Sequence, residues 1–294
     1  MKDMKIIPLG TVSPFCKDNK NCPGYLVKYG DQNLLLDCGN GVTRLLNIPD
    51  DLKNLTIIIS HLHPDHYGDL NALLQGIYVY RKLGYIDSTI KLYVPKYDEE
   101  IETESFINED GWWDSTSKKV NILDYRIIEK YAKIAGVNFV GYGNINTKIG
   151  DMKVSTLEVP HQVKSYAIKV QTEDGTLVYS GDTGTNNNLR QFASNADLFI
   201  CESTYLKGQF RDSDNHLYAS EAAQIASDAK VGILLLTHFW PDIDKQKYVD
   251  EALPIFDCTE AAEEGKEFVL RRDNRGRINW YAYTFKFFWW RTWS

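Results

Sequence analysis

Short apolar runs, several of them rich in β-branched residues, recur along the chain at lengths typical of strands. Bounded by polar turns, such runs predict buried strands at residues 33–37, 55–60, 90–94, 177–180, 196–201 and 231–237. Longer segments repeat their apolar positions at the helical period, which predicts helices at residues 69–83, 122–135 and 220–230. In the last of these the apolar face is built from small residues that can pack closely on a sheet. Strands alternating with helices indicate an α/β layered architecture.

The chain carries no obvious linker, repeat or low-complexity stretch, so we expect residues 1–294 to form a single domain. Residues 95–146 are rich in acids and aromatic residues and are predicted to be an insertion, either a partly helical lid over the pocket or an element packed outside. Residues 280–294 form an aromatic C-terminal tail. Buried at a subunit contact, this tail would make the protein a homodimer. The alternative is base stacking beside flanking arginines.

Composition and charge narrow the classes of partner and compartment. At 294 residues with 43% hydrophobic content the chain can bury a sizeable core. Its net charge of −7 gives no general attraction to nucleic acid or to an anionic membrane, so an RNA substrate would need a local basic patch. The first apolar stretch is too short for a signal peptide, and no span reaches membrane length. Five cysteines without a Cys-x-x-Cys pair predict reduced thiols and a cytoplasmic location, although a small Cys16–Cys22 bridge is an alternative.

A cluster of metal-ligand residue types follows the apolar run at 55–60. His61, His63, Asp65 and His66 fall within six positions, and Pro64 forces a turn among them. Neutral imidazole and carboxylate are ligand types suited to zinc and similar divalent ions. The segment is therefore predicted to be a metal site rather than a polar turn that happens to contain histidine.

Other chemically competent side chains share the same predicted location. Asp37, His61, Asp182, Glu202 and His238 each lie at or just after the C-terminal end of an apolar run. In open α/β sheets, ligands bind at that edge. The pattern favours one composite site over several unrelated ones.

The motif at 61–66 provides too few ligands for two ions, and three later residues are candidates to complete the set. His161 lies in a loop between two predicted strands, Asp182 lies in a turn between glycines, and His238 ends the run at 231–237. A pair of ions about 3.5–4 Å apart can stabilise both the attacking and the departing oxygen of a displacement. We therefore predict a dinuclear site, with zinc as the first expectation and manganese or iron(II) as alternatives.

Taken in order, these motifs resemble the metallo-β-lactamase superfamily, whose members share a four-layer αββα sandwich with a two-metal centre at one edge of the sheets. The resemblance covers most of the chain and is carried by Leu9-Gly-Thr, Asp37-Cys-Gly-Asn-Gly, the motif at 61–66, His161, Ser180-Gly-Asp-Thr and Thr237-His-Phe. It implies that His61, His63 and His161 hold one ion. Asp65, His66 and His238 would hold the other, and Asp182 would bridge them.

The second half of the chain is similar to the ribonuclease Z branch of that superfamily, through residues 196–205, His216, residues 221–226 and residues 235–241. This similarity implies that His216 meets the scissile phosphate and protonates a departing oxygen, with Glu202 orienting it. Asp65 is a further candidate catalytic residue. Asp37 would fix a ligand imidazole, since ligating histidines need their other N–H satisfied.

The resemblance predicts a two-metal hydrolase, foremost a phosphodiesterase acting through a metal-bound hydroxide on a nucleic acid, such as RNA, or on a small phosphodiester. The alternative is a hydrolase of carboxylic esters, lactones or thioesters, which would use the same ions without a special need for His216. A non-enzymatic metal-dependent binding protein is the third interpretation. Members that process transfer RNA carry a long arm between the third histidine and the bridging aspartate, whereas residues 161–182 leave room for only one hairpin.

Overall fold

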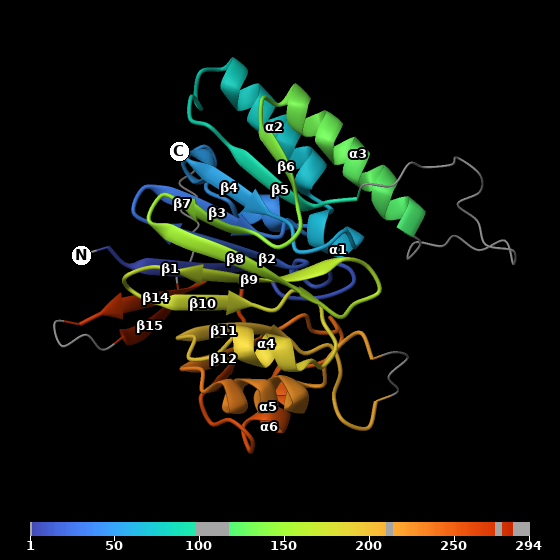
Figure 1. Cartoon of the computed structure of the whole chain (residues 1–294), viewed down its shortest axis with the longest axis vertical. Helices are drawn as coiled ribbons and strands as arrows, with labels where there is room; N and C mark the ends of the chain where they lie inside the picture. Colours follow the sequence, from blue (N-terminus) through green and yellow to red (C-terminus); the bar gives the residue numbers. More distant parts are fainter. Residues whose placement is uncertain (1, 98–117, 210–213, 274–277, 285–294) are drawn as a thin grey trace, which may run out of the picture.

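Two β-sheets packed face to face form the centre of the molecule, with helices on both outer faces (Figure 1). The computed structural model describes residues 2–97, 118–209, 214–273 and 278–284. The first sheet has the order β15 (Ile278–Thr284), β14 (Lys266–Arg272), β1 (Met4–Gly10), β2 (Gly24–Tyr29), β3 (Gln32–Leu36), β4 (Leu55–Ile58), β5 (Lys91–Pro95), β6 (Asn138–Tyr142). The second has the order β13 (Thr259–Ala261), β12 (Ile233–Thr237), β11 (Leu198–Glu202), β10 (Thr176–Tyr179), β9 (Ser165–Gln171), β8 (Met152–Val159), β7 (Asn146–Ile149).

The central strands are apolar on both faces because each face is covered. In β3, Leu34 and Leu36 lie in the core between the two sheets, whereas Leu35 points to the helices outside. In β11, Ile200 lies between the sheets and Phe199 packs toward the opposite outer layer. Successive side chains of a strand point to opposite faces, so unbroken apolar runs are the sequence pattern of this double burial.

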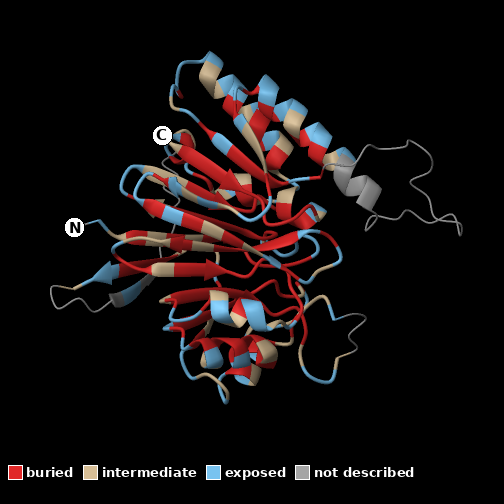
Figure 2. Cartoon of the chain, in the orientation of Figure 1, coloured by how far each residue is buried: buried red, intermediate tan, exposed pale blue. Residues whose placement is uncertain are grey.

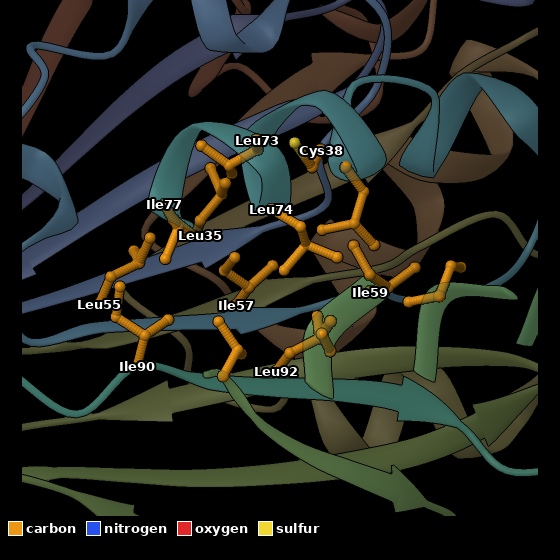
Figure 3. Packing of buried hydrophobic residues seen from close by; sticks show 14 of the residues in the cluster. Leu35, Cys38, Leu55, Ile57, Ile59, Leu73, Leu74, Ile77, Ile90 and Leu92 are labelled. Atoms are coloured by element: carbon orange, nitrogen blue, oxygen red, sulfur yellow. The ribbon is translucent and has the colours of Figure 1, made fainter. Parts of the chain in front are cut away.

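The outer face of the first sheet is covered by α2 (Leu70–Lys82) and α3 (Lys118–Ile134). Leu73, Leu74 and Ile77 form one face of α2 through their spacing, and Figure 3 shows them directed at Ile57 and Leu92 of the sheet. The opposite face of α2 is exposed (Figure 2) and carries Ala72, Tyr78 and Val79 beside Gln75 and Lys82. The buried positions recur at the helical period, which explains why the sequence predicted a helix at 69–83.

The outer face of the second sheet is covered by α4 (Asn187–Phe192), α5 (Ala219–Ala229) and α6 (Gln246–Ala252). The small residues predicted to allow close packing are buried in α5, namely Ala222, Ala223, Ala226 and Ala229. With α2 and α3 on the other side, the layers are helix, sheet, sheet, helix. The four-layer αββα expectation is therefore confirmed.

Two segments differ in detail from the sequence-based expectation. Of residues 95–146, which were predicted to be an insertion, α3 belongs to the outer helical layer and β6 is the edge strand of the first sheet, paired with β5. Residues 98–117 lie outside the described residues. The aromatic tail begins as a regular strand, β15, which pairs antiparallel with β14, and residues 285–294 lie outside the described part.

Parallel strands bring distant segments of the chain to one edge of the sandwich. β3 runs parallel to β4 and β5, and β10 runs parallel to β11 and β12. The turns that follow these strands, together with the short helix α1 (Pro64–Tyr67), line that edge. The 3-10 helices η1 (Val42–Leu45) and η2 (Asp50–Leu52) lie between β3 and β4.

No helix among the described residues combines the length and apolar character needed to cross a membrane. All five cysteines are free thiols, and the Sγ atoms of Cys16 and Cys22 lie 3.8 Å apart without a covalent bond. The cytoplasmic location stays a prediction.

Candidate metal centre

The seven predicted ligands come together on turns at the edge described above. His61 and His63 follow β4, Asp65 and His66 lie in α1, and the others follow β8, β10 and β12; these are His161, Asp182 and His238. His61 and His66 are fully buried, and Asp182 is 2% exposed. Side chains of this polarity are buried only where other groups compensate them.

The first group of ligands consists of three histidines and one carboxylate. Nδ1 of His63 lies 3.2 Å from Nε2 of His61 and 3.1 Å from Nε2 of His161. Oδ2 of Asp182 lies 3.6 Å from Nε2 of His61. One donor atom from each of these residues can be chosen so that all lie within 4.8 Å of one another.

The second group consists of Asp65, His66 and His238. Oδ2 of Asp65 lies 3.5 Å from Nε2 of His66 and 3.4 Å from Nε2 of His238. The same two nitrogens lie 3.3 and 3.0 Å from the carboxylate oxygens of Asp182. Asp182 therefore contacts both groups, and the grouping is the one that the superfamily resemblance implies.

Hydrogen bonds outside the groups determine which ring nitrogen faces inward. Nδ1 of His66 donates to Oδ2 of Asp37 over 2.8 Å. The Ser60 hydroxyl donates its proton to Asp37 over 2.7 Å, so it can only accept from its other neighbour. Nδ1 of His61 therefore donates to the Ser60 hydroxyl over 3.0 Å. In their neutral form, both imidazoles are thereby fixed with the unprotonated Nε2 toward the centre.

The same logic applies to the other two histidines whose Nε2 faces the centre. Nδ1 of His161 donates to the backbone oxygen of Asn215 over 3.0 Å. Nδ1 of His238 donates to the Thr204 hydroxyl over 2.8 Å, and Thr204 in turn donates to Oε2 of Glu202 over 2.9 Å. In the neutral form that binds a metal, four histidines thus direct their Nε2 lone pairs into one small volume.

This arrangement fits divalent metal ions. Nε2 of His66 and Nε2 of His238 lie 3.3 Å apart, so two neutral rings would direct their lone pairs at each other, an arrangement that a cation stabilises. Oδ1 of Asp182 is buried without a hydrogen bond. A buried acceptor of this kind requires a compensating positive group, and an imidazole and carboxylate donor set suits zinc.

The pKa shifts show what a metal ion must displace. Burial lowers the pKa of His63 to about 4 and also lowers that of His61 and His161, so these rings are neutral at neutral pH. Burial would also lower the pKa of His238, but the carboxylates of Asp182 and Asp65 outweigh this effect and raise that pKa to about 10. In the metal-free chain His238 therefore carries a proton, and the carboxylates of Asp182, Asp65 and Asp37 likewise outweigh burial and raise the pKa of His66 well above its ordinary value.

Metal binding should consequently release protons. Because His238 must lose its proton to ligate, we expect apparent metal affinity to rise as the pH is raised from 6 to 8. Calorimetric titrations of the metal-free protein with zinc in two buffers of different ionisation enthalpy measure the proton release directly. Equal binding enthalpies in both buffers would contradict this expectation.

His216 and Glu202 form a hydrogen-bonded pair beside the ligands. Nδ1 of His216 donates to Oε1 of Glu202 over 2.8 Å and lies 3.9 Å from Oδ2 of Asp182. Glu202 is 1% exposed, and its carboxylate also accepts the backbone N–H groups of Thr183 and Leu217 at 3.0 and 3.2 Å.

Two opposing effects set the pKa values of His216 and Glu202: burial, which favours the neutral form of each group, and the mutual attraction of their charged forms. Burial lowers the pKa of His216, but the Glu202 carboxylate outweighs it and raises the pKa above the ordinary value. Burial raises the pKa of Glu202, yet His216 outweighs that effect and lowers it. The arrangement holds an imidazolium whose Nδ1 is occupied, which leaves Nε2 as the atom able to pass a proton to another molecule.

Several residues that support the site escaped the sequence-based analysis. The Ser13 hydroxyl donates to Asp65 over 2.8 Å, and the Tyr179 hydroxyl donates to Asp37 over 2.7 Å. Thr204 contacts both His216 and His238, and the backbone of Asn215 holds His161. Of these, only Thr204 carried a sequence signal, because it lies two residues after Glu202 at the end of an apolar run.

The segment between His161 and Asp182 is fully described and consists of the β9–β10 hairpin. It contains no long arm, in agreement with the spacing in the sequence. The centre is therefore bounded by short turns on this side.

The sequence profile of the family described as "Anti-Pycsar protein Apyc1" matches residues 4–256. "Probable metallo-hydrolase YhfI" of Bacillus subtilis is 28% identical over 236 residues, which cover 80% of this chain and 86% of the relative. A protein described as "Ribonuclease Z" from Thermococcus sibiricus is 28% identical over 286 residues, covering 85% of this chain and 90% of the relative.

Solved structures of similar architecture agree on the fold. The crystal structure of the metallo-β-lactamase fold protein YhfI from Bacillus subtilis superposes with a TM-score of 0.73 at 24% identity, covering 92% of this chain and all of that one. The short form of human tRNase Z gives a TM-score of 0.61 at 18% identity, covering 81% and 93%. Both likenesses support the metallo-β-lactamase sandwich.

Proposed function

The chain belongs to the family of the anti-Pycsar protein Apyc1 and is a metal-dependent hydrolase of the metallo-β-lactamase superfamily, and from that premise we propose that it is a phosphodiesterase with two divalent ions. The residues that would hold one ion are His61, His63 and His161. Those that would hold the other are Asp65, His66 and His238, with Asp182 shared. Zinc is the ion we propose first, because imidazole and carboxylate are its ordinary ligands.

When bound, such ions supply Lewis acidity and lower the pKa of water toward neutrality. The protein supplies orientation. Asp37 accepts hydrogen bonds from Ser60, His66 and Tyr179, and so fixes the ring that faces the site. Asp65 is proposed both as a ligand and as a candidate catalytic residue. Its carboxylate lies close to His66 and His238 and accepts a hydrogen bond from Ser13.

The Glu202–His216 pair is the observation that carries the phosphodiesterase proposal. Departure of an alkoxide from phosphorus requires a proton, and His216 can supply one from Nε2 while its ring lies beside the ligand carboxylate of Asp182. Glu202 orients the ring and stabilises its charge. A positioned acid of this kind typically contributes about 10²–10⁴-fold to rate.

Hydrolysis of carboxylic esters, lactones or thioesters is the competing proposal, because the same ions polarise a carbonyl. A thiolate or a lactone alkoxide departs with less need for a positioned imidazolium. The buried Glu202, which accepts hydrogen bonds from Leu217, Thr183, Thr204 and His216, is a costly arrangement for a reaction that does not use it.

The proposed substrate is small. The hairpin between His161 and Asp182 offers no extended surface for a folded RNA, and a net charge of −7 opposes capture of a polyanion. The description "Ribonuclease Z" refers to RNA as the substrate of a relative. For this chain we propose RNA only as a second choice of substrate, after small phosphodiesters.

A substrate panel tests the proposal. Zinc- or manganese-loaded protein should hydrolyse bis(p-nitrophenyl) phosphate and compact nucleotide phosphodiesters, and it should act on a 3′-extended transfer RNA more weakly than on a dinucleotide. Efficient cleavage of thioesters or lactones without any phosphodiester cleavage would replace this proposal with the competing one. The Asp182→Ala protein is the control for activity that does not depend on the centre.

We also propose a homodimer that uses the aromatic C-terminal region. On the edge strand β15, Trp280 and Tyr281 are 44% and 45% exposed in the single chain. Large aromatic side chains on an edge strand favour contact with a second copy. Sedimentation of the wild type and of a Trp280→Ser and Tyr281→Ser double variant measures whether the wild type is a dimer and whether loss of the two rings disrupts it.

A further inference from the structure

Two thiols lie next to each other in the loop between β1 and β2. The Sγ atoms of Cys16 and Cys22 are 3.8 Å apart, and both cysteines are free. Cys16 is exposed, whereas Cys22 is fully buried. The pair therefore has one thiol that a small reagent can reach and a second thiol, behind it, that only the first can reach.

The backbone of the loop holds the two cysteines together. Lys17 and Lys20 pair as an antiparallel bridge, in which the N–H of Lys20 donates to the carbonyl of Lys17 over 2.9 Å. The two residues between them, Asp18 and Asn19, have φ values of 50° and 63°. Two consecutive residues with positive φ form the tight turn that reverses an antiparallel pair, and aspartate and asparagine tolerate this conformation. The turn thus returns the chain directly, which places one cysteine beside the other.

The buried thiol is fixed in the fold, and the exposed one is free to move. The N–H of Cys22 donates to the backbone oxygen of Asn40 over 2.9 Å, and the carbonyl of Cys22 lies so close to Gly10 that no Cβ fits there. The thiol of Cys16 donates to the same oxygen of Asn40 over 2.9 Å. A disulfide has an S–S distance of about 2.05 Å, so the sulfur atoms must approach by roughly 1.8 Å. Cys16 can make this movement by giving up its hydrogen bond to Asn40.

We infer that Cys16 and Cys22 form a reversible dithiol–disulfide site that small disulfides, such as oxidised glutathione, oxidise. The thiolate of Cys16 attacks one sulfur of the oxidant, which forms a mixed disulfide and releases one molecule of thiol. The thiolate of Cys22 then attacks the sulfur of Cys16, which breaks the mixed disulfide and releases the second thiol. The pair loses two electrons and two protons, and the oxidant gains both.

This site lies in the loop that supports a proposed metal ligand. The hydroxyl of Ser13 donates to Asp65 over 2.8 Å, and the N–H of Ser13 donates to the backbone oxygen of Phe239 over 3.0 Å. Ser13 precedes Cys16 and lies outside the ring that a disulfide between residues 16 and 22 would close. Oxidation should therefore tie the tip of the loop while the contact with Asp65 persists, so the inference does not depend on the proposed function.

The test is a titration of the folded protein with glutathione buffers that range from fully reduced to fully oxidised. Manganese replaces zinc in the buffer, because zinc also binds thiolates. Free thiols are then blocked with N-ethylmaleimide, and the protein is digested with trypsin. Lys17 and Lys20 lie between the two cysteines, so the cysteines fall on different tryptic peptides. These peptides stay joined only if the disulfide has formed.

We expect joined peptides in oxidised buffer and their separation by dithiothreitol. A thiol held beside its partner competes strongly with free glutathione, so the joined form should exceed the glutathione adduct of Cys16 at least about tenfold. Cys22→Ser should reverse this ratio and trap the adduct on Cys16. Cys16→Ser should leave Cys22 unmodified, because no reagent reaches it.

Cys258, the other exposed cysteine, is the internal control. It should take up glutathione without joining to another peptide, and Cys258→Ser should leave the joined peptides at the wild-type level. The inference is overturned if Cys16 takes up glutathione as Cys258 does and no joined peptides form. It is also overturned if the joined peptides form only after guanidinium has unfolded the protein, or if Cys16→Ser leaves Cys22 open to glutathione.

Discussion

Replacing Asp182 with alanine should strip bound metal and lower phosphodiester hydrolysis at least about a thousandfold. The carboxylate lies 3.6 Å from His61, 3.3 Å from His66 and 3.0 Å from His238, so it joins both groups of ligands. Metal ions supply several kcal/mol of charge stabilisation in the transition state, and each 1.36 kcal/mol corresponds to a factor of ten in rate. Metal content by mass spectrometry and kcat/KM on bis(p-nitrophenyl) phosphate measure the two effects.

Asp174→Ala provides the matched control. Asp174 is also a buried aspartate, 8% exposed, and it accepts a hydrogen bond from Tyr29 over 2.8 Å rather than facing the histidines. This variant should keep its metal. Wild-type metal content in Asp182→Ala, with activity within tenfold of the wild type, would contradict the assignment of this residue as the shared ligand.

Replacing His216 with alanine should lower hydrolysis of dinucleotides about 10²–10⁴-fold while leaving metal content unchanged. His216 lies 3.9 Å from the Asp182 carboxylate but is oriented by Glu202, so its loss leaves the seven proposed ligands in place. The loss should be much smaller on bis(p-nitrophenyl) phosphate, whose leaving group departs readily without a proton. Steady-state kinetics on both substrates measure the contrast.

The pH profile supplies a second measurement of the same residue. Because Glu202 holds the pKa of His216 above its ordinary value, the acid is protonated at neutral pH and loses its proton as the pH rises through the raised pKa. Dinucleotide hydrolysis should fall on that alkaline side, and the fall should disappear in His216→Ala. Glu202→Gln should shift it to lower pH. Equal losses on both substrates with an unchanged profile would argue against general-acid catalysis.

Much of the fold was predictable because the central strands are buried on both faces. The runs at 33–37, 177–180 and 231–237 correspond to β3, β10 and β12 with boundaries shifted by up to two residues. Strands whose residues are only partly apolar were missed, and β2 contains Lys28 while β1 contains Pro8. β6 was assigned to an insertion because its residues are mostly half-buried at the sheet edge and read as loop.

The ligands were predictable for a different reason. Parallel strands deliver the residues that follow them to one edge, so position at the end of an apolar run was enough to group Asp37, His61, Asp182 and His238. The supporting contacts depend on how the layers pack. Ser13 meets Asp65 across 52 positions of sequence, and Tyr179 meets Asp37 across 142, and no local pattern encodes such pairs.

The division of the site between two kinds of support bears on how its specificity could diverge. The imidazoles are anchored through Asp37, Ser60 and Thr204, close to strand ends, whereas an open hollow near the centre is lined by other side chains of the turns after β11 and β12, among them Gln209, Trp240 and Ile243. Substitutions of these lining side chains can therefore change the surroundings of the reactive centre while its anchors stay in place. A library randomised there, with the anchors kept, should yield enzymes of altered preference at intact intrinsic reactivity, so the scaffold is suited to evolving new selectivity.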